Sequence, residues 1–152
     1  MYAERAPLQQ WGYNGRVAVM GIDFGNRRVG IALSESEILA TPHLILLNDG
    51  DLDSLIDRIR LLAVEIGASR VILGAPRRPS GTDPKYQAFA DRIEASTGLP
   101  VLLWDESYST IEASELRRQR DGKMRRRRNA IDDEAAAVIL QSWLDAQNRR
   151  EP

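Results

Sequence analysis

The stretch Val17–Ser34 reads V-A-V-M-G-I-D-F-G-N-R-R-V-G-I-A-L-S and decides the fold. Two runs of β-forming residues flank a short polar turn that holds Gly25, Arg27 and Arg28, a pattern typical of a β-hairpin. The first run ends on Asp23, although a buried carboxylate is costly unless it is paired, hydrogen-bonded or bound to a metal. We therefore expect Asp23 to serve chemistry on phosphate groups.

Length and composition are those of a soluble globular protein. The chain has 152 residues, of which 43% are hydrophobic and 28% are charged, enough for one domain with a sheet and several helices. It has no cysteine, which excludes disulfides, thiolate metal sites and cysteine nucleophiles and fits a reducing cytoplasm. No apolar run approaches the roughly 20 residues of a membrane span, and the amino-terminus has no signal-peptide core. We expect a cytoplasmic protein with a polar extension at residues 1–15, a single domain at 16–148 and a tail at 149–152.

The charge of the chain is unevenly distributed. The net charge is only −1, but the range Arg117–Arg128 holds eight cations and one acid, which leaves the rest of the chain near −8. A concentrated positive field favours a polyanionic partner, and a solvated run of charges is the alternative.

The remaining elements alternate between strands and helices. Apolar spacing predicts strands at 38–47, with Pro42 at an edge or a bulge, at 70–75 and at 100–104. Capping residues predict a helix from Asp51 to Gly67, a helix from Asp83 to Gly98 and a helix opened by a capping box at 109–112. A last helix is opened by Asn129 or Asp132, and its predicted inner face holds Ile131, Ala135, Val138, Ile139 and Leu144. The residues between 76 and 83 are rich in turn formers and predict a loop.

This order predicts an α/β fold with a mixed five-stranded sheet. A three-strand antiparallel meander precedes two parallel strands, and helices flank the sheet on both faces. Active sites of such sheets lie at the carboxyl ends of strands. Asp23 and the pair Asp105–Glu106 lie at such ends.

Three carboxylates could together hold divalent cations. Asp23, Glu106 and Asp132 are far apart in sequence, and only the fold could assemble them. Mg²⁺ and Mn²⁺ prefer oxygen ligands, and two such ions about 4 Å apart can drive phosphodiester hydrolysis. Each acid also has a structural explanation: a hydrogen-bonded turn for Asp23, an ordinary loop acid for Glu106, and a favourable position in the first helical turn for Asp132.

Four motifs in order resemble the YqgF/RuvX family over residues 16–144: D-F-G-N-R-R-V-G-I-A-L-S, V-I-L-G-A-P, L-P-V-L-L-W-D-E-S-Y-S-T-I-E-A and I-D-D-E-A-A-A-V-I-L-Q-S-W-L. The resemblance implies an RNase H-like fold and a metal-dependent endonuclease that processes the 5′ end of pre-16S rRNA, related to resolvases of Holliday junctions. It implies that Asp23, Glu106 and Asp132 are the catalytic residues and the ligands of Mg²⁺ or Mn²⁺. Asp105 and Asp133 would support them.

Two departures from the family pattern concern the substrate. Ser107 stands where the family usually has arginine. G-A-P-R-R-P-S-G-T-D-P replaces a commoner loop of the type G-L-P-x-x-x-D-G, so that Arg77 and Arg78 are expected to take over phosphate contacts. Arginine suits phosphate well, and such contacts are independent of sequence. The expected nucleic-acid-binding residues are Arg27, Arg28, Arg77, Arg78, Arg125, Arg126, Arg127 and Arg128.

Several alternatives stay open at this point. The Asp23 hairpin also resembles the phosphate hairpin of actin-like and sugar-kinase folds, although no second glycine-rich loop is visible. A non-catalytic nucleic-acid or ribosome-assembly module, with the small ribosomal subunit as partner, would keep the same fold. His43, the single histidine, is expected at a core or edge position, so a histidine-based triad is not expected. Few aromatics interleave with the basic run, which favours duplex or branched nucleic acid, and a homodimer would suit a symmetric junction.

Overall fold

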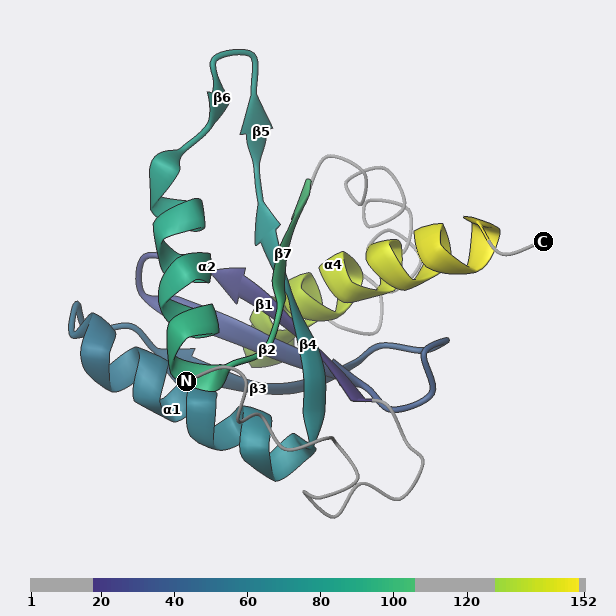
Figure 1. Cartoon of the computed structure of the whole chain (residues 1–152), viewed down its shortest axis with the longest axis horizontal. Helices are drawn as coiled ribbons and strands as arrows, with labels where there is room; N and C mark the ends of the chain where they lie inside the picture. The colour runs from purple at the N-terminus through teal and green to yellow at the C-terminus, as the bar shows by residue number, and fades with distance from the viewer. Residues whose placement is uncertain (1–17, 106–127, 151–152) are drawn as a thin grey trace.

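A five-stranded mixed sheet forms the centre of the molecule (Figure 1). The computed structural model describes residues 18–105 and 128–150, and the side chains of the last helix from residue 134 to 149. The sheet has the order β3-β2-β1-β4-β7, with β1 at its centre. Its strands are β1 (Ala18–Phe24), β2 (Arg28–Ser34), β3 (Thr41–Leu47), β4 (Ala68–Ala75) and β7 (Val101–Asp105). The antiparallel pairs β1–β2 and β2–β3 and the parallel pairs β1–β4 and β4–β7 confirm the predicted meander and parallel extension.

Helices cover both faces of this sheet. Helices α1 (Leu52–Ile66) and α2 (Pro84–Thr97) pack on one face, where Ile22, Ile31 and Leu73 belong to the larger apolar core. Helix α4 (Arg128–Arg150) packs on the other face against a smaller core. None of the helices in the described ranges is long and apolar enough to cross a membrane.

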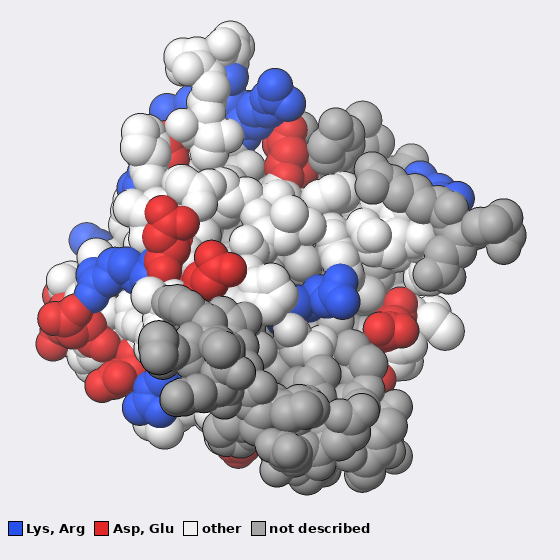
Figure 2. Space-filling view, viewed as in Figure 1, with Lys and Arg blue, Asp and Glu red and all other residues white. Residues whose placement is uncertain are grey.

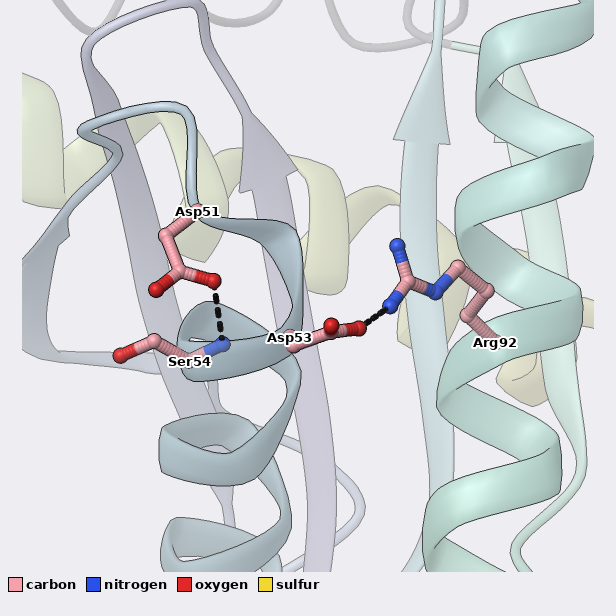
Figure 3. Close-up of polar contacts among 4 residues, drawn as sticks. All are labelled: Asp51, Asp53, Ser54 and Arg92. Carbon is pink, nitrogen blue, oxygen red and sulfur yellow. Dashed lines mark hydrogen bonds and ion pairs between the residues drawn. The ribbon is translucent and has the colours of Figure 1, made fainter.

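The ends of α1 and α2 confirm the predicted caps. The Asp51 carboxylate accepts a hydrogen bond from the Ser54 amide at 3.1 Å (Figure 3). Gly67 ends α1 in the left-handed conformation with φ +74°. Asp83 caps α2 by accepting from the Lys85 amide, and Gly98 ends that helix. An ion pair between Asp53 and Arg92 joins the two helices at the surface (Figure 3).

The outer strand β3 is an edge strand with a bulge. Ile31 pairs with Leu44 but Ala32 pairs with Pro42, so His43 is the extra residue between them. Proline cannot donate to a ladder and is tolerated at such places. The expectation of an edge or bulge at Pro42 is confirmed, and His43 is exposed at the edge.

Three expectations were wrong in detail. Residues 77–82 are not a plain loop: β5 (Arg77–Arg78) pairs antiparallel with β6 (Gly81–Thr82) to form a small hairpin. Helix α4 already includes Arg128, which puts Asp132 in its second turn rather than its first. The buried face of α4 also differs from the prediction, because Ala135 and Val138 are only half-buried. It consists of Ala136, Ala137, Ile139, Leu140, Trp143 and Leu144.

Candidate active site at the carboxyl ends of β1 and β4

Asp23 lies at the carboxyl end of the central strand and is half-buried. Its register partners are Gly30 on β2 and Gly74 on β4, one on each side. Register partners point to the same face of a sheet, and neither glycine has a side chain. The Asp23 carboxylate is therefore not crowded by side chains from the two neighbouring strand positions.

The strand alternation puts Asp23 on the face covered by α4. Gly21, two residues earlier on β1, is in close contact with that helix: a Cβ atom there would lie 2.8 Å from the Leu140 Cβ and 3.2 Å from the Ala136 carbonyl oxygen. Residues two apart on a strand share a face. Asp23 thus points toward the same layer of the molecule as Gly21.

Helix α4 runs opposite to β1. Near its carboxyl end, Asn148 donates to the Glu37 carbonyl oxygen in the β2–β3 connection, which lies beside the amino end of β1. Asp132 is four residues before Ala136, about 6 Å along the helix axis, and Asp23 is two residues after Gly21, about 6.6 Å along the strand. The backbone of α4 at Asp132 and Asp133 therefore lies at the level of Asp23.

Asp105 ends β7 on the other face of the sheet. Gly74 pairs with Trp104, and Trp104 donates from Nε1 to the Ser142 hydroxyl on α4 at 3.1 Å. Alternation then places Asp105 on the face of Leu103, toward α1 and α2. Two strand spacings of roughly 4.8 Å also separate it from β1. Asp105 and Asp23 lie at the carboxyl ends of parallel strands, and so at the same end of the sheet, but on opposite faces.

The structure locates only part of the expected carboxylate set. Glu106 and Ser107 lie outside the described residues, and only the backbone is described for Asp132 and Asp133. Among the described side chains, no three histidine, aspartate or glutamate residues gather into a metal-binding group. Asp23, with its hard oxygen ligands and glycine neighbours, fits a site for Mg²⁺ or Mn²⁺.

Exposed arginines lie on the two connections that follow β1 and β4. Arg27 and Arg28 are exposed at the β1–β2 turn, and Arg77 and Arg78 are exposed on the β5–β6 hairpin. Arg125, Arg126 and Arg127 lie outside the described residues, and Arg128 is described only as the first backbone position of α4.

Asn48 holds the β1–β2 turn, a role that its local sequence does not predict. Its side-chain amide donates to the Gly25 carbonyl oxygen at 3.0 Å, and its backbone amide donates to the Arg27 carbonyl oxygen at 2.8 Å. Within the turn, the Gly25 amide donates to the Arg28 carbonyl oxygen at 3.0 Å. Asparagine is common in turns, so only the fold could show that this one reaches a turn 23 residues away.

Comparison with known proteins finds one family and many relatives. The profile of the family described as "RuvX: Holliday junction resolvase" matches residues 17–146. A "Putative pre-16S rRNA nuclease" of Symbiobacterium thermophilum is 38% identical over 136 residues, which cover 87% of this chain and 94% of the relative. A protein of the same name from Anaeromyxobacter dehalogenans is 37% identical over 139 residues, covering 88% and 98%. The resemblance drawn from the four motifs is confirmed.

Solved structures confirm the expected RNase H-like fold. The Thermus thermophilus RuvC structure in complex with a Holliday junction substrate superimposes with a TM-score of 0.63 at 14% identity, covering 88% of this chain and 97% of RuvC. The fowlpox virus Holliday junction resolvase gives a TM-score of 0.53 at 10% identity, covering 86% and 99%. At these identities the likeness concerns the fold alone.

Proposed function

The chain belongs to the RuvX family of Holliday junction resolvases, and we propose that it is an endonuclease that hydrolyses phosphodiester bonds in structured nucleic acid. The first substrate we propose is the 5′ leader of pre-16S rRNA, because relatives named for that activity cover most of this chain. The observation that carries the proposal is the position of Asp23. It lies at the carboxyl end of the central strand, where open α/β sheets bind their ligands, on the face that α4 covers.

The proposed catalytic residues are Asp23, Glu106 and Asp132, which would together hold Mg²⁺ or Mn²⁺. Such ions lower the pKa of a bound water and neutralise charge on the leaving oxygen. Two arguments support the set. The backbone of Asp132 lies at the level of Asp23, and Glu106 directly follows Asp105, the last residue of β7, in the sequence. Asp105 and Asp133 remain proposed as supporting carboxylates.

We propose that Arg27 and Arg28 contact phosphates next to the scissile bond. They follow Asp23 by four and five residues, in a turn to which the Asn48 side chain is hydrogen-bonded. Because the fork of a guanidinium matches a phosphate and stays charged, these residues would add affinity without reading the base sequence. The basic run that includes Arg125, Arg126, Arg127 and Arg128 is proposed to extend this contact along the substrate.

A second candidate substrate is branched DNA. The matching family is described by its action on Holliday junctions, and the phosphodiester chemistry would be the same. Two active sites are needed to cut a junction symmetrically, so this reading predicts a homodimer. A non-catalytic module that binds the small ribosomal subunit would keep the basic surface and lose the need for the carboxylates.

The test is cleavage of two substrates by the wild-type protein and by Asp23→Asn. A 16S precursor with its 5′ leader and a four-way DNA junction are incubated with Mg²⁺ or Mn²⁺. We expect metal-dependent cleavage that Asp23→Asn lowers by at least about 100-fold, since a ligated cation contributes several kcal/mol of transition-state stabilisation and each 1.36 kcal/mol is tenfold in rate. Asp57→Asn, an exposed acid on α1, is the matched control and should retain the wild-type rate.

The preferred substrate separates the two nuclease readings, because the assay compares RNA and branched DNA directly. Equal rates for wild type and Asp23→Asn on both substrates would refute the nuclease proposal. Tight binding without any cleavage would favour the assembly module instead.

A further inference from the structure

The β5–β6 hairpin stands out from the rest of the molecule (Figure 1). It leaves the carboxyl end of β4 after Pro76 and projects beyond the edge of the sheet, on the end where Asp23 and Asp105 lie. Arg77 pairs with Thr82 and Arg78 with Gly81, and Gly81 adopts φ +102°, which closes the turn. The hairpin is thus an ordered arm that carries two adjacent arginines.

Both legs of the arm are anchored next to Asp23. The first leg continues β4, whose Gly74 is the register partner of Asp23. The second leg enters α2 at Asp83, whose carboxylate accepts from the Lys85 amide at 3.0 Å. On α2, the buried Tyr86 packs edge-on against Phe24, the residue after Asp23, at a centroid distance of 6.2 Å. The arm is therefore held at a defined position relative to the candidate catalytic carboxylate.

The charge of the arm is not neutralised by the described residues. Residues 77–85 hold three cations and one acid, and Asp83 is used in the helix cap. Arg77 and Arg78 are exposed, and within residues 18–105 and 134–149 neither has an ion-pair or hydrogen-bond partner for its guanidinium. Figure 2 shows basic side chains on this projection at the top of the view.

Several other described arginines are engaged with the protein itself. Arg58 donates to the Leu47 carbonyl oxygen at 2.8 Å, Arg60 pairs with Asp57, and Arg92 pairs with Asp53. Exposed, unpaired guanidinium groups on a fixed arm are suited to an external anion. Residues 77–83 contain no aromatic side chain on which a base could stack, which disfavours a single strand and favours a phosphate backbone.

We propose that the β5–β6 hairpin is a clamp for the duplex flank of the substrate, with Arg77 and Arg78 on its phosphates. Arg77 lies three residues past Gly74, about 10 Å along the chain, which equals roughly three base-pair rises of 3.4 Å. We therefore expect the clamp to contact the duplex within a few base pairs of the scissile phosphate. The inference rests on the proposed function, since it takes Asp23 as the point of cleavage.

The salt dependence of binding tests the phosphate contacts. Affinity is measured in the Asp23→Asn background for RNA and DNA duplexes, with and without Arg77→Ala/Arg78→Ala. Each lost contact lowers the slope of log K against log salt by about 0.9 on B-form DNA, so the double substitution should lower the magnitude of that slope by about 1.8. Arg60→Ala/Arg149→Ala removes the same charge elsewhere and should leave the slope unchanged. Arg77→Lys/Arg78→Lys, which keeps the charge, should restore most of it.

Flank length tests the position of the clamp. Substrates are built with eight or two base pairs beyond the mapped cleavage site, as RNA and as DNA. We expect the parent protein to lose affinity on the short flank, and the Arg77→Ala/Arg78→Ala variant to bind both lengths equally weakly. A loss on RNA flanks alone would identify RNA as the duplex, and the converse would identify DNA.

The outcomes separate the clamp from the nuclease proposal. An unchanged salt slope, or a variant that still distinguishes the two flank lengths, refutes the clamp even when the wild-type protein cleaves normally. A protein that cleaves no substrate refutes the nuclease proposal, whereas the salt slope still reports whether Arg77 and Arg78 bind phosphates.

Discussion

Gly21→Ala should displace α4 from the sheet. We expect this shift to lower the cleavage rate even under conditions in which the variant stays folded. The new Cβ would lie 2.8 Å from the Leu140 Cβ and 3.2 Å from the Ala136 carbonyl oxygen, whereas ordinary contact begins at 3.4 Å. The helix must therefore move by about 0.6 Å, the difference between 3.4 and 2.8 Å. Truncation of Leu140 to alanine would not relieve the contact between the two Cβ atoms, because alanine keeps its Cβ.

The expected magnitudes differ for stability and for activity. Overpacking of this kind costs about 1–3 kcal/mol of the free energy of unfolding. The same shift moves the α4 backbone at Asp132 relative to Asp23, and a misplacement of about 1 Å in a catalytic site can cost 100-fold in rate. We expect a lower melting temperature with the fold retained, and a loss of cleavage between tenfold and 100-fold under conditions in which the variant is folded.

Leu140→Ala is the matched comparison for this experiment. Leu140 is fully buried, and its truncation should cost about 2–5 kcal/mol, as much as Gly21→Ala or more. It leaves a cavity and does not push the helix away, so cleavage below the melting temperature should fall less than in Gly21→Ala. The measurement pairs thermal unfolding with single-turnover cleavage. If activity follows stability equally in both variants, the spacing between α4 and β1 does not control the site.

Three further substitutions test contacts that hold the surroundings of the site. Asn48→Ala removes the hydrogen bond to the Gly25 carbonyl oxygen and should lower the free energy of unfolding by about 1 kcal/mol, measured by denaturant unfolding. Substrate binding should weaken in a binding titration, because the turn that carries Arg27 and Arg28 is released. Gln141→Ala removes the hydrogen bonds to the Ala40 amide and the Ile38 carbonyl oxygen, and should lower the free energy of unfolding in urea by about 1–3 kcal/mol. Hydrogen exchange of the Ala40 amide should become faster, because that amide loses its acceptor. Asp53→Asn weakens an exposed ion pair and should change stability by less than about 1 kcal/mol, an effect that disappears in high salt.

Local signals made the helices α1 and α2 predictable. Asp51 and Gly67 bracket a run with clear three- and four-residue apolar spacing, and each residue acts through its own neighbours. The phase of α4 was harder to predict, because residues 135–140 are apolar without interruption and so give no periodic contrast. The sheet, not the helix sequence, selects Ala136 and Leu140 as the inner face by presenting Gly21 to them.

The β5–β6 hairpin was not predictable as a strand pair. Its strands have two residues each, too few for an alternating pattern, and its turn formers predict a loop equally well. What the sequence did indicate was the chemistry, because Arg77 and Arg78 were expected on phosphate. Their fixed placement depends on Asp83 and on Tyr86 against Phe24, a contact between residues 62 positions apart.

The candidate site itself combines what the sequence states and what only the register supplies. The sequence singles out Asp23 as a carboxylate at a strand end and contains Gly30 and Gly74 as two glycines among eleven. Strand pairing brings both glycines level with Asp23, and the alternation of side chains along the strands places Asp23 and Asp105 on opposite faces of the sheet. A side chain at either glycine position would point to the same face as the Asp23 carboxylate, so these two positions limit what can approach it. Access to Asp23 therefore depends on Gly30 and Gly74, which have no side chain and take no part in catalysis. A sequence motif can therefore identify the acid but not the space around it.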